Sequence, residues 1–244
     1  MKYCVVIPVR LKSTRLPNKP LIKIIGKSMV QRTFERVLMA VEKENIFILT
    51  DSIEIFQHCK EFTDNVIMTP KECLTGTDRV AEFSKTFKNF DFYVNVQGDE
   101  PIINPKDITT IINKQLKYPE CIINGFSLIN DSVQYFSPHI PKMIMDENNF
   151  LLYSSRSPIP GSKSMNFDNV LSYRQICIYS FPKDSLILFG LGKNKSKNEK
   201  DEDIEVIRFL DNSMKVKMVN CIGNSIAVDT KEDLLEVKRI LSKK

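Results

Sequence analysis

The sequence predicts an α/β fold in which helices cover a mostly parallel sheet. Two observations support this class. Short apolar runs typical of buried strands alternate with segments of helical periodicity, and the conspicuous polar motifs directly follow strand-like runs. Ligands of such folds bind beyond the carboxyl ends of the strands, so functional residues are expected in those loops. The 244 residues are enough to bury the core of one such domain without metal ions or disulfide bonds.

The first half of the chain alternates strands and helices. In its first helical segment, the apolar residues expected on one face are Val30, Phe34, Val37, Leu38 and Val41. Pro105 is expected to open a later helix, because proline is well tolerated in a first turn. The expected elements are a strand at 3–9, a helix at about 29–41, strands at 46–49 and 66–68, a helix after Thr75, a strand at 90–96, a helix from 105 and an apolar segment at 121–129.

The second half is less regular and is expected to begin with a hairpin. Apolar segments at 142–145 and 150–153 flank a polar turn at 146–149. We find no internal repeat and no linker rich in Gly or Pro, so residues 1–244 are predicted to form a single domain. The remaining expected elements are a loop at 157–169, a strand at 175–181, a lysine-rich loop at 193–200, a helix at about 201–210, a strand at 215–219 and a helix at 231–241.

The composition excludes several classes of protein. With 35 basic and 30 acidic residues, the net charge is +5, which fits a small anionic substrate. This charge, without Trp or an aromatic-basic stripe, does not indicate nucleic-acid binding. Six scattered cysteines form no Cys-x-x-Cys pair, so zinc and thioredoxin-like sites are not expected. No apolar run approaches the length of a membrane span, so we expect a cytoplasmic protein without membrane insertion.

A cationic loop, residues 10–19, follows the first strand. Arg10, Lys12, Arg15 and Lys19 lie close together in sequence and are interleaved with hydroxyl groups such as that of Ser13. Each anionic oxygen of a polyphosphate needs a positive charge or a hydrogen-bond donor, so the loop is typical of a triphosphate site. The Walker motif is excluded because its glycines are missing. The competing interpretation is an ordinary solvated loop.

Two carboxylates are candidate ligands for Mg²⁺. Asp99 follows the strand at 90–96, and Asp229 lies between an apolar run at 225–228 and the last expected helix. Mg²⁺ prefers oxygen ligands and usually takes one or two carboxylates together with phosphate and water. For Asp229, the competing interpretation is an ordinary cap at the N-terminus of the helix.

Other polar residues follow strands in the first half. Asp51 and Asp78 do so, although Asp78 beside Arg79 also fits a simple ion pair or a first-turn carboxylate favoured by the helix dipole. Gly76, between two threonines, would let the backbone approach a bound base. Each residue is therefore a candidate for the site with a structural alternative.

The second half supplies further cations. Lys142, Arg156 and Arg174 are candidates, with surface charge as the competing interpretation. The two histidines, His58 and His139, neighbour no nucleophile or metal-like pattern, so catalysis by histidine is not expected.

Together these segments resemble the 3-deoxy-manno-octulosonate (Kdo) cytidylyltransferases, also called CMP-Kdo synthetases, within the wider sugar nucleotidyltransferases. The resemblance extends over almost the entire chain. Its most specific parts are Gly-Thr-Asp-Arg at 76–79 and Val-Gln-Gly-Asp-Glu-Pro at 96–101. The other matching stretches are 7–17, 19–21, 26–27, 153–160 and 228–230.

The resemblance implies a Rossmann-like fold of the nucleotide-diphospho-sugar transferase type. An inserted hairpin region at 131–181 would bind the sugar and form a homodimer. The implied reaction transfers CMP from CTP to the anomeric hydroxyl of Kdo and releases pyrophosphate, for the synthesis of lipopolysaccharide or another surface polysaccharide. CTP and a 3-deoxy-2-ulosonic acid would be the ligands, and Mg²⁺ the cofactor.

The resemblance also implies roles for individual residues. Arg10, Lys19, Asp99 and Asp229 would be catalytic, and the two aspartates would bind Mg²⁺. The residues expected around CTP are Pro8, Val9, Arg10, Ser13, Lys19, Thr77, Arg79 and Gln97. The residues expected around the sugar acid are Arg156, Gln175, Tyr179, Glu202 and Glu205.

Two departures from the family leave alternatives open. The usual Arg-His-Ile-Gly-Ile-Tyr segment has the uncharged Gln175 in place of its His, and the lysine-rich loop at 193–200 replaces a segment that usually contains Pro and Leu. One alternative is therefore a cytidylyltransferase for a modified acceptor, such as 8-amino-Kdo or a nonulosonic acid. Another is an inactive nucleotide-binding regulator, which the presence of all four catalytic candidates disfavours.

Overall fold

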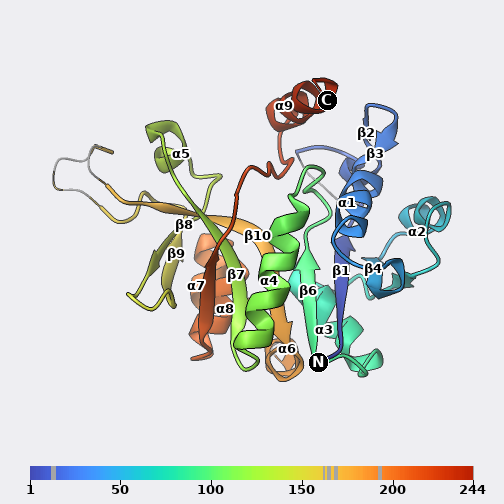
Figure 1. The fold of residues 1–244 in the computed structure, drawn as a ribbon, viewed down its shortest axis with the longest axis horizontal. Coiled ribbons are helices and arrows are strands. Elements are labelled where there is room, and N and C mark those ends of the chain that lie inside the picture. Colours follow the sequence, from blue (N-terminus) through green and yellow to red (C-terminus); the bar gives the residue numbers. More distant parts are fainter. Residues whose placement is uncertain (12–14, 162, 164–165, 168–169, 192–193, 244) are drawn as a thin grey trace.

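The structure is a computed structural model that describes residues 1–11, 15–161, 163, 166–167, 170–191 and 194–243. Helices pack on both faces of a twisted central sheet, as Figure 1 shows. The strands are β1 (Tyr3–Val9), β2 (Lys23–Ile24), β3 (Lys27–Ser28), β4 (Ile46–Thr50), β5 (Val66–Met68), β6 (Phe92–Val96), β7 (Ile122–Leu128), β8 (Lys142–Met145), β9 (Leu151–Ser155), β10 (Tyr173–Pro182) and β11 (Val216–Asn220).

The helices alternate with these strands through the first half of the chain. Short 3-10 turns lie at Lys19–Leu21 and Lys43–Asn45. The α-helices are α1 (Met29–Leu38), α2 (Ile53–Lys60), α3 (Gly76–Thr86), α4 (Pro105–Lys117), α5 (Ser132–Phe136), α6 (Lys183–Leu191), α7 (Lys197–Glu202), α8 (Val206–Asp211) and α9 (Lys231–Ser242).

The main sheet has the order β11-β7-β10-β6-β1-β4-β5. Strand β1 pairs in parallel with β4 and β6, β4 with β5, and β7 with β11. Strand β10 is the exception, because it lies antiparallel between β6 and β7. The predicted class, an α/β fold with a mostly parallel sheet, is therefore confirmed.

Apolar side chains bury both faces of the sheet. On one face, Val5 of β1 belongs to a cluster with Val30 of α1 and Ile108 of α4. On the other face, Val6 belongs to a cluster with Phe189 of α6. Strand β1 is thus buried on both faces, which explains its uninterrupted apolar sequence.

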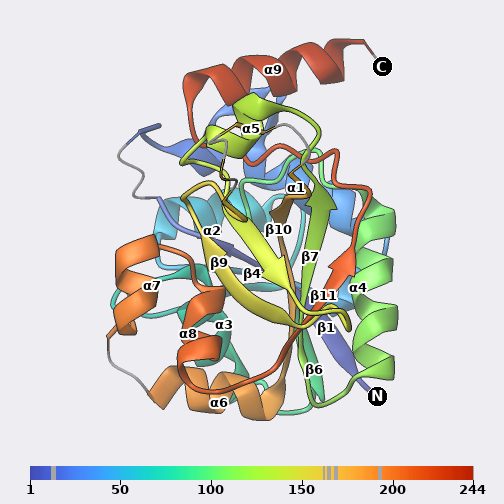
Figure 2. The same cartoon turned by 90° about the vertical axis from the view of Figure 1, so that its left-hand side faces the viewer.

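Helix α9 lies beside the β2–β3 hairpin at the end of the sheet where β1 and β6 finish (Figures 1 and 2). Val237 of α9 packs in a small separate core with Leu16, Ile24, Met29 and Val228. This core fixes the end of the cationic loop next to the segment that carries Asp229.

The inserted hairpin is confirmed, and β8 and β9 extend the sheet through the pairing of β8 with β10 (Figure 2). The expected lysine-rich loop at 193–200 is wrong from residue 197 onward, because α7 begins there behind a capping box formed by Ser196 and Glu199. The single helix expected at 201–210 is also wrong. Asp203 adopts a left-handed backbone with φ of 52°, which separates α7 from α8.

Several elements were not expected from the sequence. They are the β2–β3 hairpin, α2, α5 and α6. Helix α6 carries an uninterrupted apolar run at 186–189 in place of an apolar stripe with polar neighbours, so its sequence does not show that Leu186 and Phe189 are buried while Leu188 is 52% exposed. Within the described residues, no helix combines the length and apolar character needed to cross a membrane.

Candidate active site

The end of β1 and the segment after β6 lie in close contact. A Cβ atom at Gly98 would lie 2.9 Å from Val9 Cγ2 and 3.1 Å from Pro8 O, so a larger residue would require a shift. The hydroxyl of Thr33 in α1 also donates to Gly98 O at 3.1 Å. This close approach places Asp99 beside the cationic loop.

Lys19 joins the two candidate metal ligands. Its Nζ lies 2.6 Å from Asp99 Oδ2 and 3.0 Å from Asp229 Oδ1, and the backbone N–H of Val228 donates to Asp99 O at 2.9 Å. Burial by itself lowers the pKa of Lys19, but the charges of the two carboxylates and their hydrogen bonds raise it above its ordinary value. Residues distant in sequence therefore form one charged cluster at the sheet edge.

Asp229 is free to join this cluster because other residues cap α9. The hydroxyl of Thr230 accepts a hydrogen bond from Asp233 N, and the Asp233 carboxylate accepts one from Thr230 N. The interpretation of Asp229 as an ordinary helix cap is therefore wrong. Burial raises the pKa of Asp229, but the charge and hydrogen bond of Lys19 hold it below its ordinary value.

The arginines of the cationic loop lie around the cluster. Arg15 Nη2 is 3.3 Å from Asp229 Oδ1. Arg10 is exposed just beyond β1. The hydrogen bond from Lys195 is the main cause that lowers the pKa of Asp203, and the charge of Arg10 contributes. The charge of Arg10 therefore reaches Asp203, which lies between α7 and α8.

The paired carboxylates have the donor chemistry that a divalent cation needs. Asp99 and Asp229 both direct an oxygen at one positive charge, that of Lys19. Mg²⁺ prefers such hard oxygen donors and takes phosphate and water as its other ligands. Among the described residues, no group of three or more His, Cys, Asp or Glu side chains could hold a metal ion. The magnesium assignment stays a prediction.

The first turn of α3 is held by a carboxylate from far along the chain. Thr75 caps the helix, and Glu205 accepts hydrogen bonds from Gly76 N at 3.2 Å, Thr77 N at 2.8 Å and Thr77 Oγ1 at 2.5 Å. A Cβ atom at Gly76 would lie 2.8 Å from Gln97 Nε2. Thr77, expected around CTP, therefore contacts Glu205, which is expected around the sugar, and Gln97 lies against the adjacent Gly76.

The neighbours Asp78 and Arg79 have different partners. The buried guanidinium of Arg79 donates to Asp51 Oδ2 at 3.1 Å and to the hydroxyl of Thr69, whereas Asp78 accepts from Arg208 Nη1 at 2.6 Å. The ion pair between Asp78 and Arg79 is therefore wrong, and the first-turn carboxylate at Asp78 is confirmed. A contact of Arg79 with CTP stays a prediction.

Arg156 and Glu202 connect the end of β9 to α7. The Glu202 carboxylate accepts from Ser155 Oγ at 2.6 Å and Arg156 N at 2.8 Å. The Arg156 guanidinium donates to the carbonyl oxygens of Glu202, Pro138 and Asp203 at 2.6, 3.0 and 2.9 Å. Two residues expected at the sugar site are thus adjacent, with the guanidinium engaged by the backbone.

Lys142 is completely buried, so its interpretation as a surface charge is wrong. Its Nζ donates to the carbonyl oxygens of Ser137 and Ile140 at 2.7 Å and of Arg156 at 2.5 Å. Burial and the charge of Arg156 lower the pKa of Lys142 to about 8. The three hydrogen bonds donated by the ammonium group thereby hold the segment before β8 against the end of β9.

Gln175 and Asn124 support an irregularity in β10. Gln175 Nε2 donates to Asn124 Oδ1 at 2.9 Å, and Asn124 Nδ2 donates to the carbonyl oxygens of Ile176 and Ile178 at 3.0 and 2.9 Å. The pairing of β10 with β7 shifts register at this place. Tyr179 follows and is 4% exposed, and burial raises its pKa well above the ordinary value. Contacts of Gln175 and Tyr179 with a sugar stay predictions.

The structure brings predicted site residues together at three places. Lys19, Asp99 and Asp229 meet directly, Thr77 meets Glu205, and Arg156 meets Glu202. Pro8 and Val9 lie against Gly98, Gln97 lies against Gly76, and Gln175 and Tyr179 lie on β10. Ser13 lies outside the described residues. The buried roles of Lys142 and Arg208 were not predicted, because nothing in the sequence around either residue distinguishes it from a surface cation. Roles in binding or catalysis stay predictions for all of these residues.

An α/β sheet with a cationic loop and paired carboxylates at its carboxyl edge is the construction of a nucleotidyltransferase. A family model described as cytidylyltransferase matches residues 4–223. The chain belongs to the 3-deoxy-manno-octulosonate cytidylyltransferase family. It is 35% identical to such an enzyme of Chlorobium phaeobacteroides over 98% of this chain and 97% of that one. It is 36% identical to one of Chloroherpeton thalassium over 100% of this chain and 99% of the relative.

Solved structures agree with this family. A CMP:2-keto-3-deoxy-manno-octonic acid synthetase complexed with CTP superposes with a TM-score of 0.90 at 29% identity, covering 100% of this chain and 99% of the other. A cytidylyltransferase of Leptospira borgpetersenii has a TM-score of 0.65 at 19% identity, covering 100% and 88%. The second likeness supports the fold alone.

Proposed function

We propose that this chain transfers CMP from CTP to the anomeric hydroxyl of Kdo and releases pyrophosphate, as a step in the synthesis of lipopolysaccharide or another surface polysaccharide. The convergence of Lys19, Asp99 and Asp229 carries the proposal, because it places one cation and two carboxylates at a single point beyond β1 and β6. The relatives are named 3-deoxy-manno-octulosonate cytidylyltransferases, which supports Kdo as the acceptor. The similar synthetase is named as complexed with CTP, which supports CTP as the donor.

The proposed chemistry needs charge stabilisation rather than a covalent intermediate. Negative charge grows on the α-phosphate and on the departing pyrophosphate, and fixed cations stabilise it. Arg10 and Lys19 would bind the triphosphate, with Ser13 nearby in sequence. Asp99 and Asp229 would hold Mg²⁺, which supplies Lewis-acid stabilisation of phosphate oxygens. Pro8, Val9, Thr77, Arg79 and Gln97 would surround the remainder of CTP.

The acceptor would bind on the other side of the α3 N-terminus. Glu205 lies against Thr77, so this proposed sugar ligand is fixed relative to the nucleotide side. Glu202 lies against Arg156, so two other proposed sugar ligands are adjacent. Gln175 and Tyr179 would complete this subsite from β10. We propose 131–181 as the main sugar-binding and dimerisation region.

The direct test is pyrophosphate release. The chain would be incubated with Mg²⁺, each of the four nucleoside triphosphates, and Kdo, 8-amino-Kdo or a nonulosonic acid. Turnover with CTP and Kdo alone supports the proposal. Turnover only with a modified acid selects the alternative acceptor, and CTP binding without turnover of any acid selects the inactive regulator.

A modified acceptor is the second candidate, and the neutral Gln175 motivates it. The amide of Gln175 is 7% exposed and donates to Asn124. If this residue only supports the sheet, Gln175→Met lowers thermal stability and leaves the KM for the acid within about threefold of wild type. A much larger rise in that KM, with an unchanged KM for CTP, assigns Gln175 to the acceptor site.

We also propose a homodimer that forms through the hairpin region. Large apolar side chains are exposed there: Val133 is 79%, Phe136 48%, Leu152 60% and Leu171 61% exposed. Such a concentration is typical of an interface. Leu152→Lys is expected to yield monomers in sedimentation experiments, whereas Leu235→Lys on α9, where the wild-type side chain is 65% exposed, keeps the dimer. A wild-type monomer at all accessible concentrations would refute the proposal.

The proposed cellular location is the cytoplasm. All six cysteines lie among the described residues and are free thiols, which fits a reducing compartment. Fractionation of cells that express the full chain tests this location.

A further inference from the structure

We propose that Arg208 is a positioning residue that couples the CTP side of the site to the acceptor side. This inference rests on the proposed function and deepens it. Arg208 lies in α8, is 2% exposed, and belongs to neither set of expected ligands. Its guanidinium joins a carboxylate of α3 to a carboxylate of α7.

The first link reaches the nucleotide side. Arg208 Nη1 donates to Asp78 Oδ1 at 2.6 Å, and Asp78 Oδ2 accepts from Thr75 N at 2.8 Å and from Thr75 Oγ1 at 2.7 Å. Asp78 therefore holds the cap of α3, and Arg208 holds Asp78. The next-door Thr77 is one of the residues expected around CTP.

The second link reaches the acceptor side. Arg208 Nε and Nη2 donate to the two carboxylate oxygens of Glu199 at 2.5 and 2.7 Å. Glu199 is fully buried and accepts from Ser196 N at 3.1 Å, so it fixes the start of α7. Helix α7 ends at Glu202, whose carboxylate binds the backbone N–H of Arg156.

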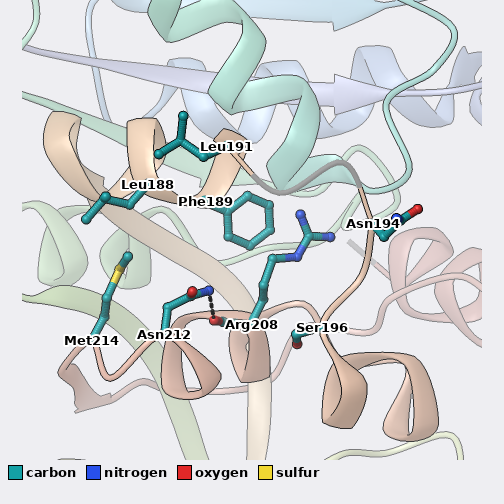
Figure 3. A pocket seen from close by; sticks show the side chains of 8 residues that line it. All are labelled: Leu188, Phe189, Leu191, Asn194, Ser196, Arg208, Asn212 and Met214. Carbon is teal, nitrogen blue, oxygen red and sulfur yellow. Dashed lines mark hydrogen bonds between the residues drawn. The ribbon is translucent and has the colours of Figure 1, made fainter.

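The arrangement requires arginine. Figure 3 shows the guanidinium of Arg208 beside the ring of Phe189, and the guanidinium carbon lies 3.8 Å from the ring centroid. Arg208 and Phe189 also line a cavity of about 430 Å³ between α6 and α8. Lysine cannot form the paired hydrogen bonds to Glu199 while also reaching Asp78, because its charge lies on one atom.

The coupling follows from the two links together. Glu205, at the start of α8, accepts hydrogen bonds from the first turn of α3. Arg208 lies one turn further along α8 and binds Asp78 in that same first turn of α3. The first turn of α3 and the segment with Glu202 and Glu205 therefore move as one unit. A shift on either side changes the affinity on the other, which is the meaning of a coupling free energy between sites.

The test uses Glu199→Gln, Asp78→Asn and the double variant, with Arg208→Lys as a separate probe. CTP affinity is measured by calorimetry without acceptor, and kcat and KM are measured for CTP and Kdo. Glu199 lies on the acceptor side, yet Glu199→Gln is expected to weaken CTP binding about fivefold or more. The double variant is expected to be non-additive in CTP affinity, because both carboxylates act through Arg208.

Ile111→Val is the matched control, because Ile111 is fully buried in α4, far in the chain from both links. It is expected to lower the melting temperature and leave CTP affinity unchanged. The proposal is overturned if Glu199→Gln and Arg208→Lys lower the melting temperature and leave CTP affinity at the wild-type value, or if the double variant is additive. Absence of wild-type turnover with Kdo would instead refute the proposed function, and the calorimetric comparison would still decide the role of Arg208.

Discussion

The ammonium group of Lys19 lies 2.6 Å from a carboxylate oxygen of Asp99. Eighty residues separate the two in sequence, and their contact joins the cationic loop to the segment after β6. Asp229 completes the contact from the other end of the chain. One ammonium group thus lies between two carboxylates, so replacing either the lysine or an aspartate changes the charge of the cluster.

Asp99→Asn is expected to lower the turnover number about 100-fold or more, because a neutral amide holds a divalent cation poorly in the proposed reaction. The circular dichroism spectrum and melting profile should stay close to wild type. The measurement is pyrophosphate release at saturating CTP and Mg²⁺. Asp64→Asn, at a side chain that is 100% exposed, is the control. Near-normal turnover of Asp99→Asn at saturating Mg²⁺ would exclude Asp99 as a metal ligand.

Lys19→Met is expected to have opposite effects on metal binding and turnover. The ammonium group occupies the position between Asp99 and Asp229, so its removal should tighten Mn²⁺ binding in the absence of nucleotide by about tenfold. Turnover should fall about 100-fold, because a cation for the triphosphate is lost.

Electron paramagnetic resonance of free Mn²⁺ measures the first effect, and pyrophosphate release measures the second. Lys27→Met is the control, since Lys27 pairs with Glu35 at the surface. Unchanged or weaker Mn²⁺ binding in Lys19→Met would show that the lysine does not compete with a cation there.

Gly98→Ala is expected to destabilise the protein by about 1–3 kcal/mol and to reduce turnover. The added methyl group would lie 2.9 Å from Val9 Cγ2 and 3.1 Å from Pro8 O, so the segment that carries Asp99 must shift. Gly161→Ala is the matched control, because its Cβ would have no atom within 4 Å. Urea unfolding and pyrophosphate release check both variants. Equal effects of the two substitutions would contradict the packing argument.

Lys142→Met is expected to reduce stability at pH 7 by about 2 kcal/mol, because three carbonyl oxygens lose their donor. The difference should depend on pH. The folded protein releases the Lys142 proton near pH 8, while the unfolded chain keeps it to about 10.5. The unfolded state then binds more protons, so the stability of wild type rises relative to the variant between these values.

Urea unfolding of wild type and Lys142→Met at pH 7, 8 and 9.5 measures this dependence. Lys60→Met, at an exposed lysine, is the control for the loss of a lysine side chain at the surface. A difference in stability that stays constant or shrinks with rising pH would contradict the assigned cause.

The sheet was predictable because its central strands are buried on both faces. The apolar sequence of β1 and the polar motif after β6 identified the strands and the edge where Asp99 lies. The antiparallel direction of β10 was not predictable in this way. A strand buried on both faces carries the same apolar pattern in either direction, and only the path of the chain between β7 and β10 decides.

The site was predictable where a motif reports chemistry directly, and less so where burial decides. Asp99 and Asp229, predicted as a pair, do meet at Lys19, although only Asp99 comes from the end of a strand, since residues 221–229 form none. The burial of Lys142 and Arg208 was not predictable, since a buried cation differs from an exposed one only through acceptors that the tertiary fold supplies. Their partners are backbone carbonyls in one case and carboxylates of α3 and α7 in the other.

The position of β10 also governs the order in which the chain matures. Strands β6 and β7 are made early, but the strand between them ends at Pro182. Until that residue has left the ribosome, β6 has an open edge of unpaired backbone groups, which invites pairing with other chains. Gln175 and Tyr179 lie on the same late strand. A nascent chain therefore joins β6 to β7 and acquires the β10 side of the proposed acceptor subsite in a single event.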